Sequence, residues 1–181
     1  MRKFLVILFA LCIFSCKEKT SHQDALKYYV MVQLQVKEVT NLVRTFSPQL
    51  AKFIRNDSSL KNTGRFNEID SFKIGYLKLM KQINERLIVI NESPVFTGGA
   101  MIKFWSENYI KDTRKFLVRT SKIISEKKYA ANSDIRKKRF LWEFKYLEIS
   151  LNLDGKWLEQ FSKDYRKFHH ITNSELSKYA L

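Results

Sequence analysis

The chain has 181 residues, of which 45% are hydrophobic and 14% aromatic, so it carries enough apolar material for the core of one folded domain. Five Gly and two Pro are too few for an all-β or a disordered protein, and this composition favours long helices. A formal net charge of +15 is typical of proteins that bind anionic partners, among which nucleic acid is the usual first candidate.

The first sixteen residues are organised like an export signal. Two basic residues precede an apolar run over residues 4–14, which is too short to cross the ~30 Å hydrocarbon core of a membrane as a helix. The run closes with Ile13, a small residue at Ser15, and Cys16. The segment resembles a bacterial lipoprotein signal peptide with its lipobox. A plain secretory signal and a buried N-terminal helix are the alternatives.

The lipoprotein resemblance implies a division of the chain into three parts. Residues 1–15 would be the signal peptide, residues 16–23 the lipidated Cys16 and a short linker, and residues 24–181 a single helical-bundle domain. The protein would then be attached to a membrane of the bacterial cell envelope by acyl chains. Because Lys17 and not an aspartate follows the cysteine, the resemblance favours the outer membrane; it leaves the periplasmic and surface faces open. Nucleic acid is not the expected partner of an exported protein.

The first long helix is predicted from about residue 21 to residue 54. Nine apolar residues follow one another at alternating steps of four and three, a heptad pattern that a strand cannot produce. Pro48 lies on the face away from this seam, where a kink is tolerable. The seam consists of Ala25, Tyr29, Val32, Val36, Val39, Val43, Phe46, Leu50 and Phe53.

Two further helices are predicted from about residue 66 to 91 and from about residue 100 to 127. Ser93-Pro94 ends the first of them, and Thr97-Gly98-Gly99 reads as a turn before the second. The apolar face of the first is formed by Ile69, Phe72, Tyr76, Leu79, Ile83 and Ile90, and that of the second by Ile102, Trp105, Tyr109, Phe116, Ile123 and Ile124.

The last long helix is predicted from about residue 133 to residue 170. Its apolar seam keeps its phase through Asp154-Gly155, which favours one continuous helix over a helix–turn–helix at that dipeptide. The seam consists of Phe140, Phe144, Leu147, Leu151, Asp154, Leu158, Phe161, Tyr165 and Phe168. Four long stripes joined by short links predict an all-α fold, an antiparallel up-and-down bundle of four long helices.

The sequence holds few of the patterns that carry catalysis. There is no Gly-rich phosphate loop, and no Glu-x-x-His pair of the kind that builds metal sites inside bundles. His169 and His170 are expected to lie in solvent at a helix end. We therefore expect a non-enzymatic protein without a catalytic residue, a metal or a cofactor.

Asp154 is the one polar residue on the last seam, and a buried carboxylate must be paired or neutralised. It is either hydrated or paired with a Lys or Arg, or it contacts a ligand. If Asp154 contacts a ligand, the sequence predicts a small-ligand pocket between the helices, lined by Thr113, Thr120 and Asp154. Trp142 and Trp157 lie off the seam and are expected to pack along its flanks; an exposed Trp would instead indicate a contact surface.

Basic residues are concentrated between residues 114 and 139, where ten Lys and Arg face two acidic residues. In an up-and-down bundle this stretch lies at the end away from the lipid anchor. It predicts a basic distal tip that binds an acidic protein or an anionic envelope polymer. The alternative is that these Lys and Arg residues only solvate that end of the bundle. The oligomeric state stays open. The candidate partner-binding residues are Arg114, Arg119, Lys127, Lys128, Arg136, Lys137, Lys138 and Arg139.

Overall fold

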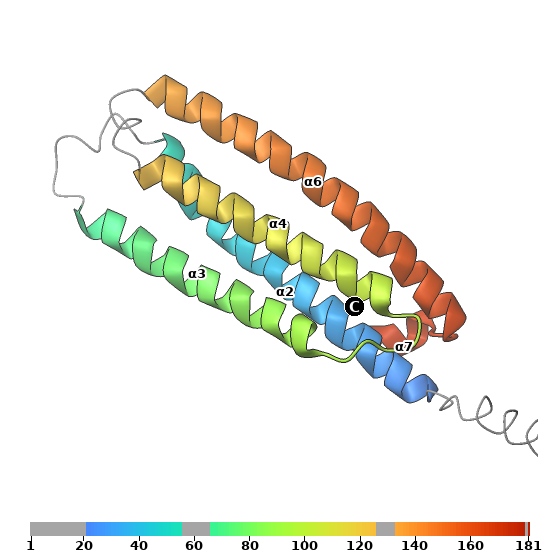
Figure 1. Ribbon diagram of the computed structural model, residues 1–181. Coiled ribbons are helices and arrows are strands. Elements are labelled where there is room, and N and C mark those ends of the chain that lie inside the picture. The colour runs from blue at the N-terminus through green and yellow to red at the C-terminus, as the bar shows by residue number, and fades with distance from the viewer. Residues whose placement is uncertain (1–20, 56–65, 126–132, 180) are drawn as a thin grey trace, which may run out of the picture.

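The computed structural model describes residues 21–55, 66–125, 133–179 and 181, which form an all-α antiparallel bundle (Figure 1). The predicted bundle of four long helices is confirmed. Signal peptide, Cys16 and linker residues up to Thr20 lie outside the described residues. The described helices are α2 (His22–Arg55), α3 (Phe66–Glu92), α4 (Ala100–Ser125), α6 (Ser133–Phe168) and the short α7 (Asn173–Ser177).

The four long helices do not pack equally. α2 and α4 lie in the middle of the bundle, α3 packs against both, and α6 packs along α4 (Figure 1). α6 meets α2 mainly where Tyr165 and Ser162 reach residues 25–33 of α2. We call this end, where α2 begins and α6 finishes, the proximal end. The distal end is the one where α2 and α4 finish.

α2 begins at a side-chain cap and keeps its seam buried. The Ser21 hydroxyl accepts a hydrogen bond from the backbone N–H of Asp24 at 3.1 Å, which satisfies one of the free donors of the first turn. Ala25, Val32 and Val39 are fully buried. The helix continues past Pro48, which is exposed as the pattern predicts.

The link between α3 and α4 is held against α2 by a close backbone approach. Gly98 has a positive φ of 75°, and a Cβ on Gly99 would lie 2.5 Å from the Tyr28 ring. The Tyr28 hydroxyl donates to the carbonyl of Gly99 at 3.2 Å, and Phe96 stacks on the same ring. The predicted turn at residues 97–99 is thus part of the proximal packing.

α6 is one uninterrupted helix of 36 residues, so the prediction of continuity through Asp154-Gly155 is confirmed. The predicted burial of Phe144 and Phe168 is wrong, because 47% and 64% of these residues are exposed. α6 packs along a single helix for most of its length, and that contact covers only a narrow strip centred on Leu147 and Leu158.

The core consists of two clusters along the bundle axis. The distal cluster joins α2, α3 and α4 to Leu147 of α6, and the proximal cluster joins α2 and α4 to the end of α6 and to α7. Leu176 of α7 and Ile171 belong to the proximal cluster, so the C-terminal segment is part of the fold. That end of the bundle is therefore closed by packed side chains.

Candidate functional site: the distal face of α4 and α6

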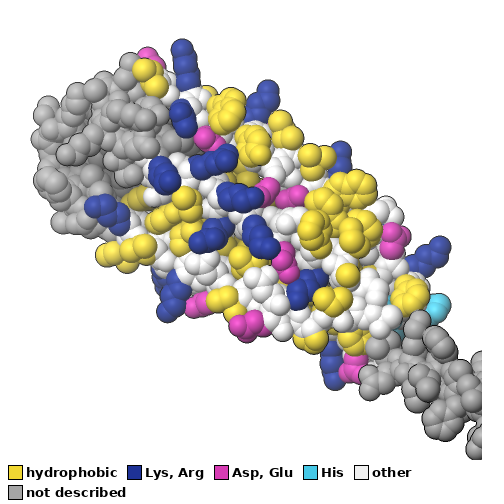
Figure 2. Space-filling view, viewed as in Figure 1, with side chains coloured by type: hydrophobic (Ala, Val, Ile, Leu, Met, Phe, Trp, Pro, Cys, Tyr) yellow, Lys and Arg dark blue, Asp and Glu magenta, His cyan; other side chains and the backbone are white. Residues whose placement is uncertain are grey.

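Basic side chains gather on the exposed face of the distal half of α4. Figure 2 shows Lys and Arg side chains over this helix, with apolar side chains beside them over α6. Arg114, Lys115, Arg119 and Lys122 are all exposed. Lys115, Arg119 and Lys122 follow at steps of four and three, whereas Arg114 lies about 100° around the helix from Lys115, toward α3. Three basic side chains therefore share one face of α4, and Arg114 lies at the edge of that face.

Two of the predicted partner-binding residues of α6 have described side chains, and both lie beside this face. Lys138 and Arg139 are exposed, in the second turn of the helix. Arg136 and Lys137 lie in the first two turns, but their side chains are outside the described set. Lys127 and Lys128 also lie outside the described residues, in residues 126–132. Four of the predicted residues, Arg114, Arg119, Lys138 and Arg139, therefore have described positions, in the distal halves of α4 and α6.

Glu143 of α6 is a buried carboxylate at the centre of this face. Its side chain is only 6% exposed, and Oε2 accepts a hydrogen bond from Nη1 of Arg119 at 3.2 Å. Nη2 of Arg139 lies 4.0 Å from the other oxygen. Two arginines from two helices therefore compensate one buried charge, which would be costly if left alone. The Arg119 guanidinium also lies 5.5 Å from the centre of the Tyr146 ring.

Asp112 of α4 makes a second polar link to α6. Its carboxylate accepts a hydrogen bond from Nζ of Lys115 at 2.7 Å and another from the hydroxyl of Ser150. Burial alone would raise the pKa of Asp112, but the hydrogen bonds from Lys115 and Ser150 outweigh it and hold the pKa below its ordinary value. Asp112 is therefore ionised and fixed in orientation at neutral pH.

Asp154 lies one turn along α6 from Ser150 and is 7% exposed. Its Oδ2 is buried and has no hydrogen-bond partner among the described residues. Burial first, and then the negative charge of Asp112, raise the pKa of Asp154 to about 6, against a smaller opposing effect of Lys115. The carboxylate is therefore placed where its charge is poorly compensated.

A groove of about 210 Å³ lies between α4 and α6 on this face. Its polar walls are the Arg119–Glu143 pair and the Asp112 cluster with Lys115 and Ser150. Phe116 and Leu147 form part of its apolar lining. Neither Thr113, Thr120 nor Asp154 lines it. Both threonine hydroxyls donate to the backbone carbonyl one turn earlier in α4, to Tyr109 and Phe116 respectively. The ligand pocket at Thr113, Thr120 and Asp154 stays a prediction.

Sequence reasoning missed most of the polar residues of this site. Glu143 and Ser150 lie four before and three after the buried Leu147, so their spacing already put them on the buried strip. That spacing was the available signal. The identity of their partners on α4 depends on which helices pack together, and no local pattern carries that information.

An exposed apolar seam runs along α6 beside the basic residues. The predicted packing of Trp142 along a flank is wrong, since 61% of Trp142 is exposed. Trp157 is 47% exposed and stacks on Trp105 of α4, with ring centres 5.8 Å apart. This exposed seam is a different stripe from the seam predicted through Leu147 and Leu158, and from here on "the seam" means the exposed one. It consists of Trp142, Tyr146, Ile149, Leu153 and Trp157.

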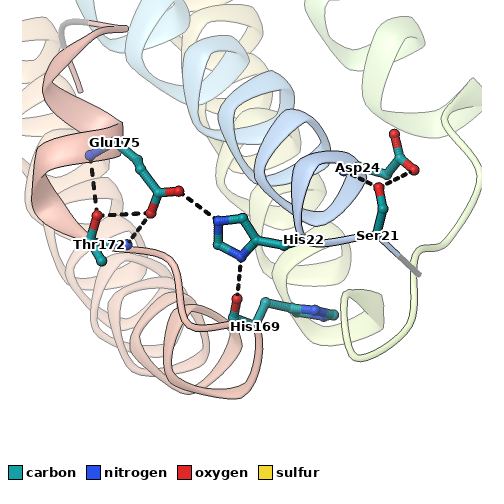
Figure 3. Close-up of polar contacts among 6 residues, drawn as sticks. All are labelled: Ser21, His22, Asp24, His169, Thr172 and Glu175. Atoms are coloured by element: carbon teal, nitrogen blue, oxygen red, sulfur yellow. Dashed lines mark hydrogen bonds and ion pairs between the residues drawn. The ribbon is translucent and has the colours of Figure 1, made fainter. Parts of the chain in front are cut away.

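At the proximal end a separate polar cluster joins the start of α2 to the end of α6 and to α7 (Figure 3). Nδ1 of His22 lies 2.8 Å from the carbonyl oxygen of His169, and Nε2 lies 2.6 Å from Oε1 of Glu175. Both neighbours only accept hydrogen bonds, so the arrangement suits the doubly protonated imidazolium. The hydrogen bond to Glu175 is the largest cause that raises the pKa of His22.

The expectation that His169 and His170 both lie in solvent at a helix end is wrong for His169 but confirmed for His170. His169 is buried, and its Nε2 donates to the carbonyl of Thr97 at 2.8 Å. His170 is exposed and has a positive φ of 57°, where α6 ends and the chain turns into α7. His169 therefore joins the α3–α4 link to the end of α6 through a buried contact.

Comparison with protein-family models, with curated proteins and with solved structures finds no match to this chain. In the described ranges no helix has the length and apolar character that crossing a membrane requires. Within those same ranges, no group of three or more His, Cys, Asp or Glu side chains is arranged to hold a metal ion. The residues of the chain itself are therefore the basis for a functional assignment.

Proposed function

We propose that this protein is a lipid-anchored component of the bacterial cell envelope whose helical bundle binds or scaffolds an acidic partner and catalyses no reaction. The observation that carries the proposal is the gathering of Lys115, Arg119 and Lys122 on one exposed face of α4, with Arg114 at its edge and Lys138 of α6 beside it. Exposed like charges repel one another, so such a face favours an anionic ligand over water and salt alone.

The position of this face supports a partner held away from the anchor. The domain begins at the proximal end, a few residues after the predicted lipid on Cys16, whereas the basic residues lie in the distal halves of α4 and α6. Arg114 to Lys122 lie 14–22 residues beyond the proximal start of α4, which corresponds to about 21–33 Å at 1.5 Å per residue. Charges at that distance are screened from the anchoring membrane at physiological salt, where the Debye length is about 8 Å.

The proposal can be tested with the lipidated protein in nanodiscs of zwitterionic lipid and immobilised poly-glutamate as the anionic probe. We expect binding that weakens as the salt concentration rises, and that is lost in the double variant Arg114→Glu/Lys138→Glu. The control Lys167→Glu/Lys178→Glu makes the same change of charge at the proximal end, and it should retain binding. Equal losses in both double variants, or no binding by the wild type, would refute a specific distal site.

A second candidate function, small-ligand binding inside the bundle, is favoured by the buried oxygen of Asp154 that lacks a hydrogen-bond partner among the described residues. A ligand with a hydrogen-bond donor would satisfy that oxygen. Native mass spectrometry of the protein purified from envelopes tests this function. A retained small molecule that is absent from Asp154→Asn supports it, and identical masses of protein without adduct contradict it.

A further inference from the structure

The apolar seam of α6 has the spacing of a helix-packing surface. Trp142, Tyr146, Ile149, Leu153 and Trp157 follow at steps of four, three, four and four, and between 47% and 61% of each residue is exposed. This is a heptad-like stripe of about 22 Å that faces solvent to one side of the strip buried against α4. A second helix could lie along it and interlock its side chains.

Basic residues border the seam on both sides. Lys138 and Lys145 are seven residues apart and run parallel to Trp142 and Ile149 along α6. On the other border Lys115 of α4 is exposed beside the groove, with its Nζ bonded to Asp112. A second copy of this chain would bring like charges together along both borders. A helix with apolar residues on its contact face and Asp or Glu on the flanking positions is complementary to both borders.

The groove between α4 and α6 opens beside the seam and gives it a concave part. Its volume of about 210 Å³ can receive one side chain of a docked helix next to Tyr146 and Arg119. Knobs of one helix entering holes of another are the contacts that fix helix register. A bilayer surface has no such rigid projections, so the groove favours a helical occupant over lipid.

We propose that the seam, together with Lys115, Lys138 and Lys145, is a docking site for an acidic amphipathic helix of another protein. The inference rests on the proposed function and names its partner class. The aromatic residues Trp142 and Tyr146 are the anchors of the contact, since large exposed aromatics beside a groove carry much of the free energy of such interfaces. The flanking lysines select acidic over basic helices.

The test measures the affinity of the lipidated protein, in zwitterionic nanodiscs, for three designed peptides by fluorescence anisotropy. The first is an amphipathic helix with Leu and Ile on its contact face and Glu on its flanks. The second carries Lys in place of Glu, and the third is a scrambled form of the first. We expect the first peptide to bind at least about tenfold more tightly than either of the others.

Variants locate the peptide on the protein. Trp142→Ala should weaken binding of the first peptide by about tenfold or more, and Lys145→Glu should weaken it in a salt-dependent way. The control Ile74→Ala removes a comparably exposed apolar side chain from α3 and should leave the affinity unchanged. Circular dichroism of each variant establishes that the fold is retained.

The outcomes separate this inference from the proposed function. If the scrambled peptide binds as tightly as the helix and Trp142→Ala has no effect, the docking site is refuted while an anionic partner stands. If neither acidic peptide nor poly-glutamate binds, the proposed function fails as well. Two results would assign the seam to another occupant and overturn the inference: binding to phosphatidylglycerol vesicles that Trp142→Ala abolishes without any peptide binding, or self-association that Trp142→Ala abolishes.

Discussion

His22 at the start of α2 and Glu175 in α7 are 153 residues apart in sequence and are joined by a 2.6 Å contact between Nε2 and Oε1. The same imidazole is bonded to the carbonyl of His169, and Glu175 completes a capping box with Thr172. One side chain of the first helix therefore ties down the end of α6 and the short C-terminal helix. Because the contact joins two titratable groups, its strength depends on pH.

The His22–Glu175 contact should stabilise the proximal end most between about pH 4.5 and 6.5. The pKa of His22 is raised above 6.5, so its contribution is full below pH 6.5 and is lost as the pH rises through the raised value. The hydrogen bond from His22 lowers the pKa of Glu175 from 4.5 to about 2, so that contribution is present above pH 4.5 and lost toward pH 2. Hydrogen exchange of α7 should show His22→Gln opening α7 more than His170→Gln at pH 5.5.

Toward pH 8.5 the difference in α7 protection between His22→Gln and the wild type should shrink, because the imidazole of the folded chain loses its proton as the pH rises through its raised pKa. His170 is exposed, which makes His170→Gln a control for the loss of a histidine near the same end. An effect of His22→Gln that is equal at both pH values would contradict an ionic contribution.

Loss of Arg119 should expose the cost of burying Glu143. We expect Arg119→Ala to lower the free energy of unfolding by about 1–2 kcal/mol, less than for a fully buried pair because Arg119 is partly exposed and Arg139 remains nearby. Removing the charge as well, in Arg119→Ala/Glu143→Gln, should recover part of the loss. Urea unfolding measures both. Arg114→Ala, at an exposed position of the same helix, should change the value by less than about 0.5 kcal/mol.

Asp154 should make the domain less stable as the pH rises. Its pKa is raised from 3.8 to about 6 in the folded chain, so the folded state holds the proton more tightly, and stability falls between those two pH values. Asp154→Asn should therefore raise the free energy of unfolding at pH 7.5, on the order of 1–3 kcal/mol, and change it little at pH 3.5. Urea titrations at both pH values, with the exposed Asp164→Asn as control, test the sign.

Two glycines should respond to alanine in opposite directions. A Cβ at Gly99 would lie 2.5 Å from Tyr28, so Gly99→Ala should destabilise the domain by about 1–3 kcal/mol through displacement of the α3–α4 link. Gly155 sits inside a helix, and apart from its chain neighbours and the helix backbone no atom of the described residues lies within 4 Å of a Cβ there. Gly155→Ala should therefore stabilise the domain by about 0.5–1 kcal/mol. Thermal unfolding followed by circular dichroism distinguishes them. A loss of stability in Gly155→Ala would mean that α6 needs local flexibility there.

Lipidation should depend on Cys16 alone. The apolar run and the small Ser15 before Cys16 resemble a lipobox, whereas bulky Leu11 precedes Cys12. Metabolic labelling with a palmitate analogue should vanish in Cys16→Ser and persist in Cys12→Ser. Label retained in Cys16→Ser would assign the modification elsewhere and remove the premise that the proximal end is the anchored one.

Local periodicity determined the fold class, the helix bounds to within a few residues and the continuity of α6 through Gly155. Those features follow from the spacing of apolar residues along one helix, which is a short-range property. The exposure of Phe144 and Trp142 was not predictable in this way, because it depends on α6 packing along α4 and barely along α2.

The contacts that define the candidate sites were decided by tertiary structure. Glu143 meets Arg119 only because α6 runs antiparallel to α4 in one rotation and register, and His22 meets Glu175 only because the last residues fold back on the start of α2. A sequence specifies which residues share a face of a helix. Which face of a second helix they meet is settled by the packing free energy of the whole bundle, to which every helix contributes.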